Sequence, residues 1–349
     1  MTIYDLMTSN NLAAYWVELT QDEAPYPCEE LFPDDKAIGL DLKWIKGARG
    51  LPAVLKASAF DVHAIPRPRI GFNRLSAQMP FFKESTYIDE EDRQRLNMVL
   101  ATGNQTYIDT VMNRIFDDET RLLRGARARR EQMRMMALTT GMISVASNGQ
   151  AYDYDYQLAN DQKGDVAVVW SNTANADPLE DIRLAQEHIY DETGVRPTRG
   201  MIDAASWRYL RNNAKIKNEI YATKPTVGAI TDSMLAEYLS DQLHGLVLYV
   251  NSVRYINDAG ARVSFMPANT LVLFPDGNLG KTWFGTTPEE SDLMSSGVAN
   301  VSIVDTGVAI TTMEKVDPVN VETKVTMITL PSFEEADKVY IMDTATASS

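Results

Sequence analysis

Residues 106–140 read TYIDTVMNRIFDDETRLLRGARARREQMRMMALTT, and we interpret this stretch as the element around which the rest of the chain is built. Its apolar residues recur at helical spacing and fall within an arc of about 100° on a helix. We therefore predict one long amphipathic helix, which begins at Thr106 and ends before Gly141, a residue type that commonly terminates helices. At about 1.5 Å per residue it would extend about 50 Å, several times the length of an average helix. The predicted core face comprises Ile108, Val111, Ile115, Leu122 and Met133.

Charges are sorted along this predicted helix. Acidic residues such as Asp117 and Glu119 lie in the first half, and most of the arginines lie between Arg121 and Arg134 in the second. This order suits the helix dipole. The arginine run is typical of a solvated helix face, while a contact with nucleic acid, with a partner or with a neighbouring subunit stays open.

Length, composition and charge limit the classes of protein to which this chain can belong. The chain has 349 residues, of which 44% are hydrophobic, enough for two or three domains with real cores. A net charge of −15 argues against a nucleic-acid binder, because such binding depends on cationic groups that neutralise phosphates. Cys28 is the single cysteine, and neither a signal sequence nor a long apolar run is present. We expect a soluble protein that is made in the cytoplasm and does not enter membranes.

The first part of the chain has apolar surface without local partners. Residues 1–36 predict an arm, with a short helix from Asn10 to Leu19 followed by proline-rich extended chain. From Ile38 to Trp44 apolar residues alternate, and a second alternation at residues 60–64 predicts the returning strand of a long hairpin. Two strands alone are marginal in water. Both arm and hairpin should therefore pack on something else.

The rest of the chain alternates between helix and strand. Residues 177–194 and 232–243 predict helices, and Asn257 to Gly260 predict a hairpin turn. Continuous apolar runs at 246–250 and 271–274 predict buried strands, the first of them central in its sheet. The last residues predict strands, one of which would return to pair beside a strand at 142–146.

The sequence contains no complete motif for nucleotide binding, metal binding or catalysis. Gly280-Lys281-Thr282 resembles the end of a phosphate-binding loop, but Pro275 stands where the first glycine belongs, and strand follows where a helix should begin. The histidines and Cys28 show no metal spacing and no catalytic triad order. We predict no catalytic, cofactor or metal site and no enzyme.

Several short motifs carry a family resemblance. Asp258-Ala-Gly260, the segment from Phe265 to Leu273 and the segment from Gly280 to Gly285 resemble a region of the lambda-like major capsid protein E family of tailed bacteriophages. The segment from Ile202 to Trp207 resembles the strand-to-helix step of that family. The order of parts is also similar, from an arm and a hairpin through a long helix and an α/β insertion to a strand-rich end.

This resemblance implies the α+β fold of tailed-phage major capsid proteins, also called the Johnson fold. It implies the following parts: an N-terminal arm at 1–36, an extended loop at 37–86, a peripheral domain at 87–175 with a spine helix at 106–140, an axial domain at 176–300, and C-terminal strands at 301–349 that return to the peripheral domain. The implied function is a structural subunit that self-assembles as pentamers and hexamers into an icosahedral shell around double-stranded DNA, without sequence-specific DNA binding.

The implied partners are further copies of the chain, a scaffold, a portal and a decoration protein, and the implied location is the virion capsid, assembled in the host cytoplasm. The predicted inter-subunit contacts of arm and loop are Trp16, Lys43, Trp44, Lys46, Arg49, Leu51, Lys56 and Phe60. The alternative is a cytosolic α/β enzyme with a small-molecule pocket in 176–300, and a nucleic-acid-binding module is a weaker third hypothesis. The enzyme alternative does not explain the arm, the hairpin or the long helix, and the net charge of −15 argues against the nucleic-acid-binding module.

Overall fold

The computed structural model describes residues 7–46, 73–88, 90–101, 105–223, 229–317 and 319–347. The chain divides into two compact units that each combine separated segments. The first unit comprises Met1–Leu42, Ser76–Arg134 and Lys281–Ser332, and the second comprises Lys43–Leu75, Met135–Gly280 and Phe333–Ser349. Both units contain helices and sheets, which confirms the predicted α+β class.

The first unit is built on a sheet in the order β1-β13-β16-β15-β14, with β4 also paired to β16. Its long strands β15 and β16 run antiparallel, whereas β1 pairs with β13 in parallel. The parallel pair places Asp34 opposite Thr282. The strands are β1 (Asp34–Lys36), β4 (Phe81–Ile88), β13 (Thr282–Phe284), β14 (Asn300–Val304), β15 (Val308–Val316) and β16 (Val319–Pro331).

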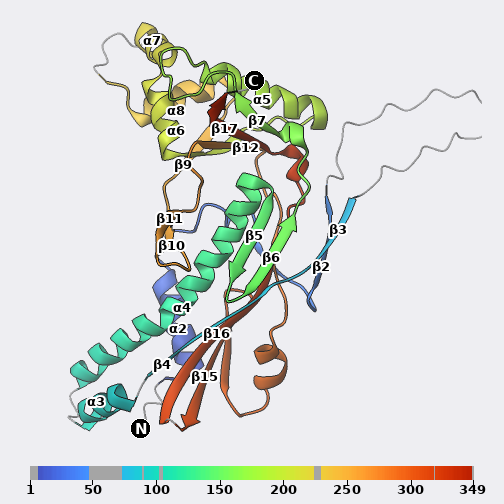
Figure 1. The fold of residues 1–349 in the computed structure, drawn as a ribbon. Coiled ribbons are helices and arrows are strands. Elements are labelled where there is room, and N and C mark those ends of the chain that lie inside the picture. Colours follow the sequence, from blue (N-terminus) through green and yellow to red (C-terminus); the bar gives the residue numbers. More distant parts are fainter. Residues whose placement is uncertain are drawn as a thin grey trace, which may run out of the picture. The chain divides into compact units, whose positions relative to one another are not determined.

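Helices pack on this sheet. Figure 1 shows α2 (Ser9–Thr20) and α4 (Gln105–Thr140) beside β15 and β16, while α3 (Glu90–Ala101) precedes α4 in the chain. Thr8 caps α2, because its hydroxyl oxygen accepts the backbone N–H of Asn11 at 3.2 Å. The core between helices and sheet contains Leu12, Trp16, Leu123, Ala126, Phe284, Val304, Val308, Ile310, Val325 and Met327.

Helix α4 agrees with the predicted long helix to within one residue. It has 36 residues and ends at Gly141, which adopts a φ of 71° and donates its N–H to the Ala137 carbonyl at 3.0 Å. This left-handed conformation favours glycine, and a Cβ there would come within 2.7 Å of the Leu158 side chain. A glycine is therefore required at this end for two reasons.

The second unit is built on a sheet in the order β7-β17-β12-β8-β9. Figure 1 shows the helices α5 to α8 gathered around this sheet. The strands are β7 (Lys163–Val166), β8 (Arg199–Asp203), β9 (Val247–Asn251), β12 (Thr270–Phe274) and β17 (Tyr340–Ala347). The helices are α5 (Pro178–Thr193), α6 (Ala204–Asn212), α7 (Ala214–Thr223) and α8 (Asp232–Gln242).

The core of the second unit combines every one of these four helices with the central strands. Ile182, Leu210, Ile220 and Leu235 come from α5, α6, α7 and α8, and Leu271 comes from the central strand β12. Three two-stranded sheets complete the described chain: β2 (Asp41–Lys46) with β3 (Asn73–Gln78), β5 (Met142–Ser147) with β6 (Gln150–Asp155), and β10 (Arg254–Ile256) with β11 (Arg262–Ser264). The hairpin predicted around Asn257 to Gly260 is thereby confirmed.

Two strand predictions need correction. The last strand, β17, pairs with β12 and β7 in the second unit, whereas β5 pairs with β6, so the predicted return beside residues 142–146 is wrong. Strand β9 pairs with β8 at the edge of the sheet and half exposes Val247 and Tyr249, although its apolar run predicted a central strand. A continuous apolar run does not reveal which strand becomes its neighbour.

The first strand of the predicted hairpin begins later than expected. Ile38 is 100% exposed, and β2 starts at Asp41, because Gly39 adopts a φ of 93°, outside the extended region. Leu42 and Trp44 do lie on a buried face. The predicted returning strand at 60–64 lies outside the described residues.

Candidate functional site

The residues predicted to touch neighbouring subunits fall into different environments. Lys43 is exposed on β2. Trp44 is buried in its own chain, with its ring 5.8 Å from that of Tyr156, so little of this side chain is left for a neighbour. The backbone of Lys46 belongs to β2, and its side chain lies outside the described part. Arg49, Leu51, Lys56 and Phe60 also lie outside the described residues.

Trp16 requires a correction. Its side chain is fully buried in the core of the first unit, and its indole N–H donates to the Asp305 carboxylate at 3.1 Å. It therefore has no surface to offer a second subunit. The sequence correctly indicated that the arm needs an apolar partner, but this partner is the sheet and helix α4 of the same chain.

The arm follows α4 along the helix in the same direction. Tyr15 donates its hydroxyl to Asp117 at 2.8 Å, and its ring contacts that of Phe116. Further along both segments, Arg127 donates to Glu29 at 2.8 and 3.0 Å and to Glu23 at 3.0 Å. Two carboxylates of the arm thus share one guanidinium of the helix, a strong arrangement for charged groups.

The end of the arm is held by buried arginines. Arg130 donates to Asp34 at 3.3 Å and to Asp305 at 2.6 Å. Arg134 donates to Asp34 and, at 2.7 Å, to the hydroxyl of Thr282. The Thr282 hydroxyl in turn donates to the Phe32 carbonyl at 2.9 Å. Ion pairs therefore connect the arm with helix α4, and hydrogen bonds of Thr282 connect both with β13, all within the first unit.

These contacts correct the interpretation of the arginine run as a solvated face. Arg130 and Arg134 are buried, and their partners are acids of the same chain. The sequence carried a signal that could have indicated this, since Glu23, Glu29 and Asp34 follow each other along the arm as the arginines do along the helix. The order of charges along the helix alone does not show that the acids of the arm pair with its arginines.

The buried face of α4 differs in part from the predicted core face. Met133 is fully buried, while Ile115 and Leu122 are half-buried. The side chains of Ile108 and Val111 lie outside the described part, although their backbone belongs to α4. Buried residues that the prediction did not include are Leu123, Met135 and Leu138.

Helix α4 also buries two carboxylic acids, Glu119 and Glu131. Burial raises the pKa of each to about 7, because a charged carboxylate loses its hydration there. Glu131 accepts the backbone N–H of Cys28 at 3.0 Å. Burial likewise raises the pKa of the Cys28 thiol, so this cysteine is an inert part of the core.

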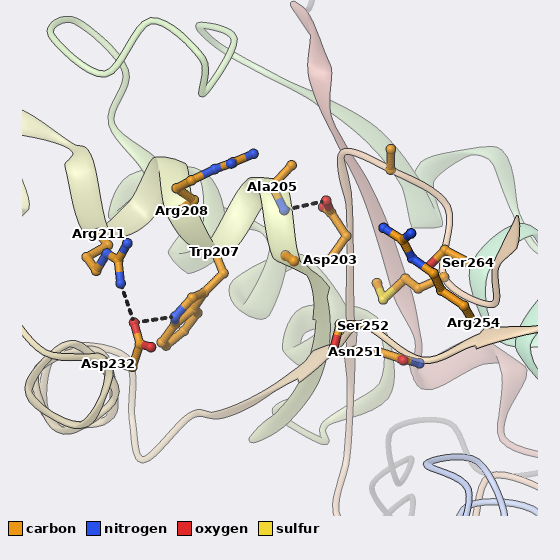
Figure 2. Close-up of a pocket in the computed structure, with 13 residues that line it drawn as sticks. Asp203, Ala205, Trp207, Arg208, Arg211, Asp232, Asn251, Ser252, Arg254 and Ser264 are labelled. Carbon is orange, nitrogen blue, oxygen red and sulfur yellow. Dashed lines mark hydrogen bonds and ion pairs between the residues drawn. The ribbon is translucent and has the colours of Figure 1, made fainter. Parts of the chain in front are cut away.

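A pocket in the second unit tests the enzyme alternative. It has a volume of about 540 Å³ and lies beside α6, β9 and β10 (Figure 2). Its carboxylates, Asp203 and Asp232, both have structural roles: Asp203 accepts the N–H groups of Ala205 and Ser206 at the start of α6, and Asp232 accepts the indole N–H of Trp207 at 3.0 Å. Neither is left free to act as an acid or base.

Within residues 7–46, 73–88, 90–101, 105–223, 229–317 and 319–347, no group of three or more histidine, cysteine, aspartate or glutamate side chains could hold a metal ion. In the same part of the chain, no helix is long and apolar enough to cross a membrane.

Solved structures share this fold. A candidate capsid protein of a prophage from Escherichia coli CFT073 is 18% identical, with a TM-score of 0.63 over 97% of this chain and 99% of that one. A phage-related protein from Bordetella bronchiseptica RB50 is 13% identical, with a TM-score of 0.56 over 97% of both chains. A capsid chain of cyanophage A-1(L) is 12% identical, with a TM-score of 0.52 over 99% of this chain and 100% of that one.

The predicted tailed-phage capsid fold is thus confirmed. No curated protein sequence matches this chain. The family model described as phage major capsid protein E matches residues 9–344, from the start of α2 into β17. Because this match spans nearly the whole sequence, the chain belongs to the phage major capsid protein E family, and it is a structural, non-enzymatic component of a phage capsid.

Proposed function

We propose that this chain is the subunit that builds the icosahedral shell of a tailed phage, through pentamers and hexamers that enclose double-stranded DNA. The observation that carries the proposal is the family match over residues 9–344. The net charge of −15 agrees with a shell that encloses DNA without binding it in a sequence-specific way. The enzyme alternative is not supported, because the family is structural.

Each part of the chain has its own role in this shell subunit. Residues 1–36 form the N-terminal arm, 37–86 the extended loop, 87–175 and 301–349 the peripheral domain, and 176–300 the axial domain. The contacts of Arg127, Arg130 and Arg134 support a modified role for the arm, which braces the spine helix of its own subunit. The extended loop then remains the segment that reaches a neighbour, with Lys43 and the further basic residues of 43–56 facing an acidic surface.

The proposed partners are further copies of the chain, a scaffold, a portal and a decoration protein. The proposed location is the virion capsid, after assembly in the host cytoplasm. Electron microscopy of the purified full-length chain, with and without a co-expressed scaffold, tests this function. Closed shells or rings of five or six subunits support it, whereas uniform single subunits under every condition would overturn it.

A further inference from the structure

The pocket beside α6 is basic although the chain is strongly acidic. Three arginines line it: Arg208 and Arg211 from α6, and Arg254 from β10. Figure 2 shows Arg208 and Arg254 on opposite sides of Asp203. In a chain with a net charge of −15, such a grouping of guanidinium groups around a hollow favours an anionic occupant.

The carboxylates of the pocket do not neutralise all three arginines. Asp203 accepts backbone N–H groups, including that of Thr270 at 3.1 Å, and Asp232 accepts from Arg211 at 3.2 Å. Arg208 and Arg254 are exposed, and neither guanidinium group forms a hydrogen bond or ion pair with any residue of the described part of the chain. Two guanidinium groups therefore remain available to an anion from outside the subunit.

The opposite edge of the same sheet has more exposed carboxylates than cations: Asp161, Asp165 and Asp343 against Lys163. Strand β7 occupies the opposite end of the order β7-β17-β12-β8-β9, and it places Asp165 directly opposite Asp343 of β17. Like charges in directly opposite positions repel each other. Asp343 accepts the N–H of Ala345 at 2.8 Å and the hydroxyl of Thr346 at 2.9 Å, whereas Asp165 is exposed and has no cationic partner among the residues the structure describes.

The negative charges near this edge also act on Tyr340 of β17. Burial raises the pKa of Tyr340, and the charges of Asp165, Asp181 and Asp161 add to that rise. Asp161 and Asp165 therefore lie close to the same ring, on or next to the edge strand. A cation that approaches this edge would relieve the repulsion between Asp165 and Asp343.

We propose that the arginine pocket of one subunit docks the acidic β7 edge of a second copy, with Arg208 and Arg254 bound to Asp165. This inference deepens the proposed function and rests on it. A ring with cyclic symmetry needs two different complementary surfaces on each subunit, because each copy contacts the next one head to tail. The two edges of this sheet provide a basic and an acidic surface of this kind.

A second copy explains more than a free phosphate does. Strand β9 ends at Asn251, which lines the pocket, and the same edge strand half exposes Val247 and Tyr249. Exposed apolar side chains on an edge strand promote non-specific association unless another surface covers them. A small anion would bind the arginines and leave this strip in water, while a neighbouring subunit would cover both.

Charge reversal in the full-length chain tests the proposal. We expect Arg208→Glu with Arg254→Glu, and separately Asp165→Arg, each to reduce the fraction of assembled subunits by about tenfold or more, measured by sedimentation velocity. The three changes combined in one chain restore complementary charges and should recover most of the assembly. An equimolar mixture of the two deficient chains should also assemble better than either chain alone.

The control is Arg183→Glu on α5, which reverses the charge of one partly exposed arginine outside the pocket and should leave assembly unchanged. Circular dichroism verifies that every variant is folded. If the parent assembles and the reversed variants assemble equally well, or if the pocket binds only inorganic phosphate without effect on assembly, this proposal is wrong and the capsid function stands. A parent that never assembles would instead overturn the proposed function, and this docking with it.

Discussion

The Glu131 carboxylate on α4 accepts a hydrogen bond of 3.0 Å from the backbone N–H of Cys28 in the arm, 103 residues earlier in the chain. Glu131 is fully buried, and its second carboxylate oxygen has no hydrogen-bond partner among the described residues. A charged carboxylate in this position lacks part of the hydration it would have in water. The Glu131 carboxyl group therefore keeps its proton to a higher pH in the folded chain than it would in water.

The stability of the first unit should fall as the pH rises from about 4.5 to 7. Glu119 and Glu131 have pKa values of about 7 in the folded chain, against an ordinary value of 4.5. Between these two pH values the folded state therefore keeps protons that the unfolded state has already lost. The free energy of unfolding is highest below pH 4.5, falls as the pH rises, and reaches its minimum above pH 7. Each acid can contribute about 3 kcal/mol to this difference.

Urea unfolding at pH 5 and pH 8 measures this effect on the unassembled chain. The double variant Glu119→Gln with Glu131→Gln removes both protons from the equilibrium, so it should lose much of the pH dependence and gain relative stability at pH 8. A double variant whose stability changes with pH as much as that of the parent would show that other groups cause the dependence.

Arg134→Met should destabilise the chain by about 3 kcal/mol or more, because it removes a buried guanidinium group that binds the Asp34 carboxylate and the Thr282 hydroxyl. Arg124→Met is the matched control. Arg124 pairs with Glu23 at 3.4 Å, and its side chain is 48% exposed, so its loss should cost no more than about 1 kcal/mol. Denaturant unfolding measures both. Equal losses would contradict the assignment of the buried arginine as the brace of the arm.

Met133→Asp should unfold or aggregate the subunit. Met133 is 0% exposed on α4, and an unpaired charge there would cost several kcal/mol, comparable to the stability of a domain. Met98→Asp makes the same substitution on α3, where the side chain is 68% exposed, and should leave the subunit folded. Soluble yield and thermal melting followed by circular dichroism compare the two. If Met133→Asp melts at the same temperature as Met98→Asp, the buried face of α4 is misassigned.

Replacement of Gly47 to Pro52 by a short turn should separate folding from assembly. In the sequence these residues follow β2 and precede β3, and shortening a connection between two strands has a small entropic effect on folding. We expect unchanged circular dichroism and a loss of stable shells. A loss of secondary structure would show that this segment supports its own subunit, and normal shells would show that it has no part in assembly.

Local patterns predicted the elements whose ends are set by neighbouring residues. Helix α4 and its terminal Gly141, helix α5 and its terminal Gly194, and the buried strand β12 could each be read from spacing and termination signals. These features depend on periodicity and on glycine conformations, which the sequence specifies within a few residues.

The contacts between distant segments could not be read in this way. The exposure of β9, the sheet position of β17 and the pairing of Arg130 with Asp305 all depend on which segments become neighbours in the fold. The same holds for the pocket, whose arginines come from α6 and β10. A pattern within one segment indicates that a side chain needs a partner, but it does not identify that partner.

Sedimentation velocity of the purified full-length chain over a wide concentration range tests the claim that this chain is a shell-forming subunit. We predict a concentration-dependent shift from single subunits to rings of five or six and to closed shells, with a co-expressed scaffold raising the shell fraction. A single species with the mass of one 38.9 kDa chain at every concentration, with and without the scaffold, would contradict the claim.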